Sequence, residues 1–177
     1  KTLLIIGGSL GARTINQSVL KGLPQLKAAG IQVLWQTGKY YFENMKQQAA
    51  PYIDENLLVT DFVKRMDYAY AIADLVISRA GASSISELCL LGKPSILVPS
   101  PNVAEDHQTK NAMALASRDA AVMITDADAP AKLADTAVGL IADEQKLSGI
   151  SANAKAMAQL DSADRIATEI LSLVTKE

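Results

Sequence analysis

Cysteine and histidine are scarce in this sequence, with one of each in 177 residues. The single cysteine, Cys89, excludes an internal disulfide and a cysteine-rich metal site, and this usage fits a reducing, intracellular compartment. The single histidine, His107, excludes a multi-histidine metal centre, and the sequence offers it no identifiable partner for acid–base catalysis. These two absences remove metalloenzymes of the Cys/His type from consideration.

The sequence also lacks an excess of either charge and any long apolar run. Its 17 Lys and Arg against 19 Asp and Glu leave no basic surface for nucleic acid. No apolar stretch approaches the ~18 to 20 residues of a membrane span, and no signal peptide precedes the first apolar run. The length and the 49% hydrophobic content predict one globular domain over residues 1–177. Because the chain enters that first run directly from Lys1, we expect it to be a domain of a longer protein.

Short β-rich runs alternate with helical stretches along the whole chain. This alternation predicts an α/β fold, namely a doubly wound, Rossmann-like, parallel six-stranded sheet. The usual strand order 3-2-1-4-5-6 would place ligands beyond the carboxyl ends of the first and fourth strands. The predicted strands are Thr2–Ile6, Ile31–Gln36, Leu57–Thr60, Leu75–Ser78, Ser95–Val98 and Ala121–Ile124. The predicted helices are Ala12–Lys27, Tyr40–Ala50, Met66–Ala73, Ser84–Leu91, Gln108–Ser117, Pro130–Ala142, Glu144–Gln159 and Ala163–Val174.

A glycine-rich turn, Gly7–Ala12, follows the first predicted strand. Glycines allow close backbone approach, and amides at a helix start attract phosphate or other polar oxygens. The alternative is a tight turn whose glycines only relieve strain. A Walker loop is excluded because no Lys-Ser or Lys-Thr pair follows. A dinucleotide site is opposed because the second strand ends Trp35-Gln36-Thr37-Gly38, without the acidic residue that holds a ribose.

A second candidate turn, Ser78–Glu87, follows the fourth predicted strand. Gly81 is followed by the small residues Ala82 and Ser83 at a helix N-terminus, which suits a diphosphate. The competing interpretation is a capping box in which Ser84 and Glu87 satisfy the first helical amides. From the residues alone, both interpretations of Glu87 remain open.

The third candidate loop lies between Pro99 and Asn111, after the fifth predicted strand. His107 and Asn111 are four residues apart, so they share one helical face with Gln108 beside them. Amide and imidazole groups both donate and accept hydrogen bonds, as hydroxyl-rich sugars require. The alternative is a solvated helix start capped by Asp106.

Two aspartates, Asp126 and Asp128, form an Asp-x-Asp pattern, whose two carboxylates could bind a metal ion. Just before Pro130, the pattern is also typical of a helix cap. We predict the cap, since hard cations need more oxygen ligands than two side chains supply. No metal is therefore assigned.

Four motifs together resemble the MurG family of glycosyltransferases, over nearly the whole chain. They are Gly-Gly-Ser-x-Gly-Ala-x-x-x-Asn, Thr-Asp-Phe-Val, Ser-Arg-Ala-Gly-Ala-Ser-Ser-x-Ser-Glu and Glu-Asp-His-Gln-x-x-Asn-Ala, beginning at residues 7, 60, 78 and 105. The family has two Rossmann-like halves in a GT-B arrangement. The resemblance covers the carboxyl-terminal, donor-binding half and implies that an amino-terminal acceptor domain lies outside this chain.

The resemblance implies a binding site for the donor UDP-N-acetylglucosamine. The backbone of Val63 would read the uracil edge, Glu87 would hold the ribose hydroxyls, and Ser9 would approach the diphosphate or the sugar. The implied donor-contacting residues are Gly7, Gly8, Ser9, Gly11, Asn16, Phe62, Val63, Met66, Gly81, Ala82, Ser83, Ser84, Glu87, His107, Gln108 and Asn111. Among these, Ala82–Ser84 would bind the diphosphate, and the last three would contact the sugar hydroxyls. His107 stands where some members have glutamine, and an arginine that members use just upstream is not in this chain.

The implied reaction is an inverting transfer of N-acetylglucosamine from its UDP donor to lipid I, giving lipid II for peptidoglycan at the cytoplasmic face of the bacterial inner membrane. The resemblance implies no cofactor, no metal and no nucleic-acid partner. Contacts with the lipid-linked acceptor and the membrane, and the catalytic base, would belong to the other half, so the isolated domain is expected to be inactive. The alternatives are a UDP-sugar epimerase, a UDP-sugar:diacylglycerol glycosyltransferase and an NAD-binding oxidoreductase domain.

Overall fold

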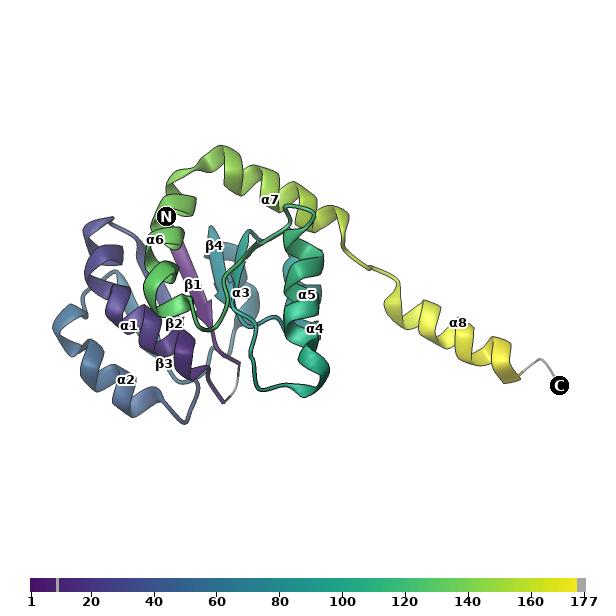
Figure 1. Cartoon of the computed structure of the whole chain (residues 1–177), viewed down its shortest axis with the longest axis horizontal. Helices are drawn as coiled ribbons and strands as arrows, with labels where there is room; N and C mark the ends of the chain where they lie inside the picture. The colour runs from purple at the N-terminus through teal and green to yellow at the C-terminus, as the bar shows by residue number, and fades with distance from the viewer. Residues whose placement is uncertain (9, 175–177) are drawn as a thin grey trace.

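The computed structural model describes residues 1–8 and 10–174 and contains a single parallel sheet of six strands. The strand order is β3-β2-β1-β4-β5-β6, which confirms the predicted doubly wound fold. Helices cover both faces of the sheet (Figure 1). The strands are β1 (Thr2–Ile6), β2 (Gln32–Gln36), β3 (Leu57–Thr60), β4 (Leu75–Ser78), β5 (Ser95–Leu97) and β6 (Val122–Met123).

Two apolar clusters, one on each face of the sheet, make up the core. Leu3 and Ile5 of β1 point into one cluster, while Leu4 and Ile6 point into the other. Successive strand residues face opposite sides, so a strand covered on both sides must be apolar throughout. The first cluster is covered by α1 (Arg13–Ala28), α2 (Phe42–Ala49), α6 (Ala129–Ala142) and much of α7 (Glu144–Ala156). The second is covered by α3 (Met66–Ile72), α4 (Ala82–Leu91) and α5 (His107–Ala116).

The boundaries differ from the predictions mainly at loops that follow strands. Helix α4 begins at Ala82, two residues before the expected start, and β6 contains only Val122–Met123. Two short 3-10 turns are also present. The first, η1 (Ala50–Tyr52), begins at the last residue of the helix predicted over Tyr40–Ala50, and the second, η2 (Ala104–Asp106), directly precedes α5. The start of α4 matters most, because it decides which side chains can cap the helix.

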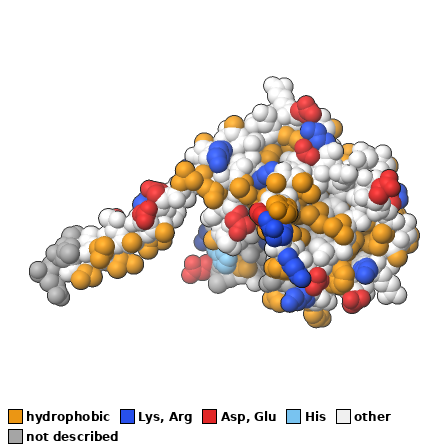
Figure 2. Space-filling view, turned by 180° about the vertical axis from the view of Figure 1, so that it is seen from behind, with side chains coloured by type: hydrophobic (Ala, Val, Ile, Leu, Met, Phe, Trp, Pro, Cys, Tyr) orange, Lys and Arg blue, Asp and Glu red, His pale blue; other side chains and the backbone are white. Residues whose placement is uncertain are grey.

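The last helix, α8 (Ser162–Val174), extends away from the body of the protein (Figure 1). None of its described residues is buried, and apolar side chains form a row along it (Figure 2). The exposed apolar residues include Ile166, Ile170, Leu173 and Val174. Within residues 1–8 and 10–174, no helix combines the length and hydrophobicity that crossing a membrane requires.

Candidate functional site

The candidate loops gather at the carboxyl edge of the sheet. Strand β1 pairs with β4 in parallel, with Ile6 opposite Ser78, so the turns that follow them leave the sheet side by side. Strand order reverses at this pair of strands, since β2 lies on the other side of β1. In doubly wound sheets, ligands bind at this switch point. The two glycine-containing turns, Gly7–Ala12 and Ser78–Glu87, therefore lie beyond the carboxyl ends of β1 and β4, as the sequence predicts.

The first turn depends on its glycines for backbone packing. Gly11 has a φ of 86°, and a Cβ there would lie 2.1 Å from the carbonyl oxygen of Thr37. Gly38 has a φ of 81° and packs equally closely against Gly11. Gly8 also has a positive φ, of 78°, but a Cβ on it would meet open space. The interpretation of the glycines as residues that relieve strain in a tight turn thus explains Gly11, whereas the space beside Gly8 leaves room for a ligand. Ser9 lies outside the described residues.

Asn16 supports this turn from inside the protein. Its side chain is buried, its Nδ2 donates to the carbonyl of Thr37 at 2.8 Å, and its Oδ1 accepts from Trp35 Nε1 at 3.0 Å. Trp35 is itself fully buried. Both ends of the amide bond to the protein and the side chain is buried, so Asn16 supports the turn from inside.

The second turn opens α4 without a side-chain cap. Gly81 occupies the N-cap position, and no side chain there accepts a hydrogen bond from the first helical amides. Ser84 is the third residue of the helix, so the capping box of Ser84 and Glu87, one of the two interpretations that the sequence left open, does not form. Glu87 instead accepts a hydrogen bond from the hydroxyl of Tyr70 at 3.0 Å. The start of α4 consequently offers polar N–H groups and a partial positive charge to an anion.

Gln36, at the end of β2, connects the first turn with the loop after β3. Its Nε2 donates to the carbonyl of Gly8 at 3.2 Å, and its Oε1 accepts from the backbone N–H of Val63 at 2.8 Å. A uracil that used this N–H would have to displace the Gln36 side chain. Phe62 is exposed and Met66 is half-buried beside this loop. The sequence marks Gln36 only as the position where a dinucleotide fold would carry an acidic residue.

The loop after β5 is held by amide side chains from α5. Gln108 Oε1 accepts from the backbone N–H of Ser100 at 2.9 Å, and Asn111 Nδ2 donates to the carbonyl of Ala80 at 3.0 Å. The second bond ties α5 to the turn before α4. His107 begins α5 and is exposed. Among residues 1–8 and 10–174, no hydrogen bond is described for Gln108 Nε2 or Asn111 Oδ1.

The Asp106 cap, which the sequence left as an alternative, does not form. Asp106 occupies the N-cap position of α5 with a φ of 51°, and its side chain makes no cap hydrogen bond. Its carboxylate accepts from the hydroxyl of Thr109 at 2.6 Å instead. The left-handed backbone turns this carboxylate away from the first amides of the helix.

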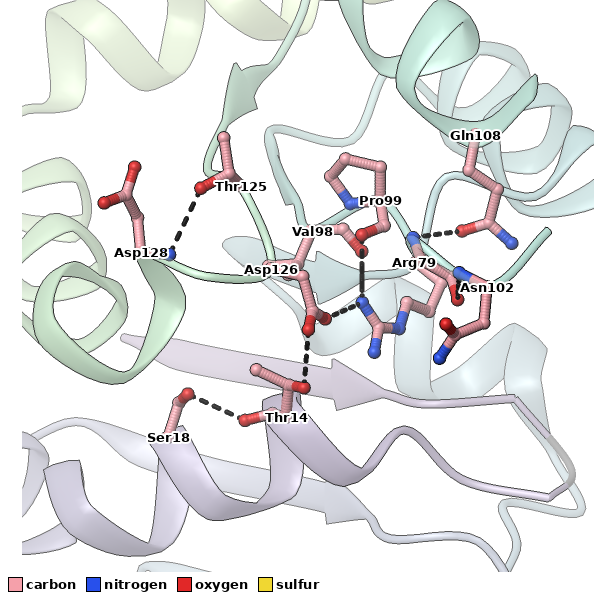
Figure 3. A network of polar contacts seen from close by, with 11 residues as sticks. Thr14, Ser18, Arg79, Val98, Pro99, Asn102, Gln108, Thr125, Asp126 and Asp128 are labelled. Carbon is pink, nitrogen blue, oxygen red and sulfur yellow. Dashed lines mark hydrogen bonds and ion pairs between the residues drawn. The ribbon is translucent and has the colours of Figure 1, made fainter. Parts of the chain in front are cut away.

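Arg79, the first residue after β4, links the three outer loops (Figure 3). Its Nη1 donates to the carbonyls of Val98 and Pro99 at 3.0 and 3.1 Å and to Asp126 Oδ1 at 2.5 Å. The other oxygen of Asp126 accepts from the hydroxyl of Thr14 at 2.8 Å. Arg79 also borders a cavity of about 700 Å³, together with the glycine turn, Tyr41, residues 100–102 and Gln108. The sequence places Arg79 inside a motif but gives no sign of its partners.

The two carboxylates of the Asp-x-Asp pattern bind different basic side chains. Asp126 pairs with Arg79, whereas Asp128 forms an ion pair with Lys132 at 3.3 Å. The described residues contain no group of three or more His, Cys, Asp or Glu side chains that could hold a metal. The side-chain cap predicted before Pro130 is wrong. Asp128 is at the N-cap of α6 without a side-chain cap hydrogen bond, and its own N–H donates to the hydroxyl of Thr125 (Figure 3).

This Rossmann-like fold and its clustered turns agree with the sequence comparisons. Residues 2–167 match the glycosyltransferase family 28 C-terminal domain, so the chain belongs to that family. It is 56% identical over 177 residues to the UDP-N-acetylglucosamine--N-acetylmuramyl-(pentapeptide) pyrophosphoryl-undecaprenol N-acetylglucosamine transferase of Parabacteroides distasonis, covering all of this chain and 48% of that protein. It is 53% identical to the protein of the same name from Porphyromonas gingivalis, over 99% of this chain and 46% of that one. The chain thus spans about half the length of these relatives.

Solved structures agree with the resemblance to the MurG family. The fold matches the crystal structure of Acinetobacter baumannii MurG with a TM-score of 0.85 and 31% identity, over 97% of this chain and 52% of that one. A putative UDP-N-acetylglucosamine 2-epimerase from Listeria monocytogenes matches with a TM-score of 0.68 but only 12% identity. The second match shows the shared fold alone. The sequence evidence therefore favours the transferase over the epimerase.

Proposed function

We propose that this chain is the donor-binding half of an enzyme that transfers N-acetylglucosamine from UDP-N-acetylglucosamine to a lipid-linked muramoyl-pentapeptide. One observation carries this proposal: α4 begins without a side-chain cap. Its first residue lies at the switch point of the sheet, beside the glycine-rich turn Gly7–Ala12. The relatives at 56% and 53% identity are named as transferases that use these substrates, which supports the proposal.

The α4 N-terminus would bind the diphosphate of the donor. A helix N-terminus carries a partial charge of about +0.5, which favours the negative charge that grows on UDP as it leaves. The amides of Ala82–Ser84 would contact the phosphates, and Glu87 would accept from the ribose hydroxyls. Gln108 and Asn111 would contact the sugar with the amide groups that remain outside their internal bonds.

The reaction would be a single displacement with inversion. A hydroxyl of the muramoyl sugar attacks the anomeric carbon, the bond from that carbon to the diphosphate breaks, and UDP leaves. We assign the base that takes the hydroxyl proton, the acceptor site and the contact with the cytoplasmic face of the inner membrane to the half of the enzyme outside this chain. This half alone would bind the donor without transferring its sugar, and would need no metal or cofactor.

Calorimetric titration of the chain with UDP-N-acetylglucosamine, UDP-glucose and NAD, with and without Mg²⁺, tests donor binding. We expect the UDP sugars to bind without Mg²⁺ and NAD to give no heat. The variant Glu87→Ala should weaken binding about 10-fold or more, as loss of hydrogen bonds from a charged group predicts. Glu43→Ala, on the exposed surface of α2, is the matched control and should leave the affinity unchanged. Binding of NAD, or no binding of UDP sugars, would contradict the proposal.

Product analysis separates the transferase from the remaining enzyme classes. Incubated with UDP-N-acetylglucosamine, the chain should return it unchanged. Release of an isomerised nucleotide sugar would support a UDP-sugar epimerase instead. Tighter binding of UDP-glucose than of UDP-N-acetylglucosamine would favour the diacylglycerol glycosyltransferases.

A further inference from the structure

Tyr70 of α3 and Glu87 of α4 form a hydrogen bond between two neighbouring helices. The phenol oxygen lies 3.0 Å from Glu87 Oε2. Tyr70 is only 5% exposed and belongs to the apolar cluster around Leu4, whereas Glu87 is exposed. The bond therefore anchors a surface carboxylate to a ring that the core holds in place.

The protonation of Tyr70 suits this role. Burial, followed by the hydrogen bond and the charge of Glu87, raises the pKa of the phenol well above its usual value. The hydroxyl thus keeps its proton at neutral pH and can only donate to a carboxylate. A long side chain loses rotamer freedom when it binds a ligand, so a carboxylate already held in place binds with a smaller entropic cost.

The position of Glu87 leaves one oxygen for an additional contact. The capping box is excluded by the start of α4, so the carboxylate is not turned back toward the helical amides. Tyr70 occupies Oε2, and within residues 1–8 and 10–174 no hydrogen bond or ion pair to Oε1 is described. Glu87 follows Ala82–Ser84, the proposed diphosphate contacts, by about one helical turn, and side chains of a helix lean toward its N-terminus.

We propose that Tyr70 is a positioning residue that fixes the Glu87 carboxylate for the vicinal hydroxyls of the nucleotide ribose. Tyr70 touches no substrate itself and acts only through Glu87. The inference rests on the proposed function, because it requires a nucleotide in the site.

The test compares Tyr70→Phe with the wild-type chain for two ligands, UDP and 2′,3′-dideoxy-UDP. Phenylalanine preserves the buried ring and removes only the donor. We expect Tyr70→Phe to weaken UDP about 5-fold, as one lost hydrogen bond predicts, and to leave the dideoxy nucleotide unchanged. In a Glu87→Ala background, Tyr70→Phe should produce no further loss, since the two residues act as one unit. Tyr52→Phe removes a hydroxyl from a half-buried tyrosine just before β3 and is the control, expected to change neither affinity.

Three outcomes would overturn the inference. Equal weakening of both nucleotides would mean that Tyr70 only braces α3 against α4. Unchanged binding of UDP by Tyr70→Phe, with weakening by Glu87→Ala, would leave the proposed function intact and remove the role of Tyr70. Failure of the wild-type chain to bind UDP would contradict the proposed function and the inference with it.

Discussion

Arg79 and Asp126 are 47 residues apart in the sequence and form an ion pair with an Nη1 to Oδ1 distance of 2.5 Å. Both side chains are mostly shielded from water, with 17% and 22% of their surface exposed. The pair joins the turn after β4 to the loop after β6, and Thr14 extends it to α1. Three segments of the candidate site are thereby held in one arrangement (Figure 3).

Replacing Asp126 should destabilise the fold. Asp126→Ala removes a charge-assisted bond from Arg79 and the partner of Thr14, so we expect a loss of about 1–2 kcal/mol and a melting temperature lower by about 3–6 °C. Asp128→Ala is the matched control, because Asp128 forms only an exposed ion pair with Lys132. Thermal unfolding of both variants checks the prediction. An equal or larger loss for Asp128→Ala would contradict the role given to Arg79 and Asp126.

The buried amide of Asn16 should also be important for stability. Asn16→Leu leaves the N–H of Trp35 and the carbonyl of Thr37 without partners, at a cost of about 2–3 kcal/mol. Gln17→Ala changes the next residue of α1, which is exposed, and should alter stability by less than about 0.5 kcal/mol. Urea denaturation measures both. A stable Asn16→Leu variant would show that the turn does not depend on this network.

The two positive-φ glycines of the first turn should respond differently to alanine. At Gly8 the new Cβ meets open space, so only backbone strain of about 1–2 kcal/mol is expected. At Gly11 the Cβ also collides with the carbonyl of Thr37, and the loss should exceed about 3 kcal/mol. Chemical denaturation of both variants checks this order. Similar losses at the two positions would mean that Gly11 does not pack against Thr37 in solution.

Asp54 should contribute a pH-dependent part of the stability. A hydrogen bond from Lys27, followed by one from the backbone N–H of Asn56, holds the pKa of Asp54 below its ordinary value of 3.8. The folded state therefore binds fewer protons than the unfolded chain. Its contribution is complete above about pH 4 and is lost as the pH falls through the lowered pKa.

The variant Asp54→Asn should consequently melt at a lower temperature than the wild type at pH 7, and the difference should shrink toward pH 3. Thermal unfolding across this range makes the comparison. Glu55→Gln, at the next position, lacks a described ion pair and serves as the control. A difference that stays constant or grows toward low pH would contradict the role of Lys27.

Removing α8 should leave the folded body intact. A chain ending at Leu160 loses no buried residue among those described, so its stability should change by less than about 0.5 kcal/mol. The exposed row that includes Ile166 and Ile170 should promote self-association in the longer chain, which light scattering can compare. A large drop in melting temperature on truncation would mean that α8 stabilises the body.

The sequence predicts local features of the site well. Continuous apolar strands indicate a sheet covered on both faces, and the alternation of strands and helices predicts the strand order that the structure has. The predicted side-chain cap at Asp128 is wrong, and the caps at Ser84 and Asp106, which the sequence left as alternatives, do not form. A cap depends on where the helix begins and on the φ of one residue, and shifts of one or two residues redirect the side chain.

The sequence by itself therefore determined the fold class and the place of the turns, because apolar periodicity and glycine position act over short stretches of chain. The family was indicated by the resemblance of its four motifs. Only the tertiary structure decided the partners of Gln36, Tyr70 and Arg79. Each of these side chains bonds to a residue at least 17 positions away, on another element, and such contacts depend on how the helices and strands pack. Local sequence patterns do not predict that packing, so the residues that hold the site together could be identified only from the tertiary structure.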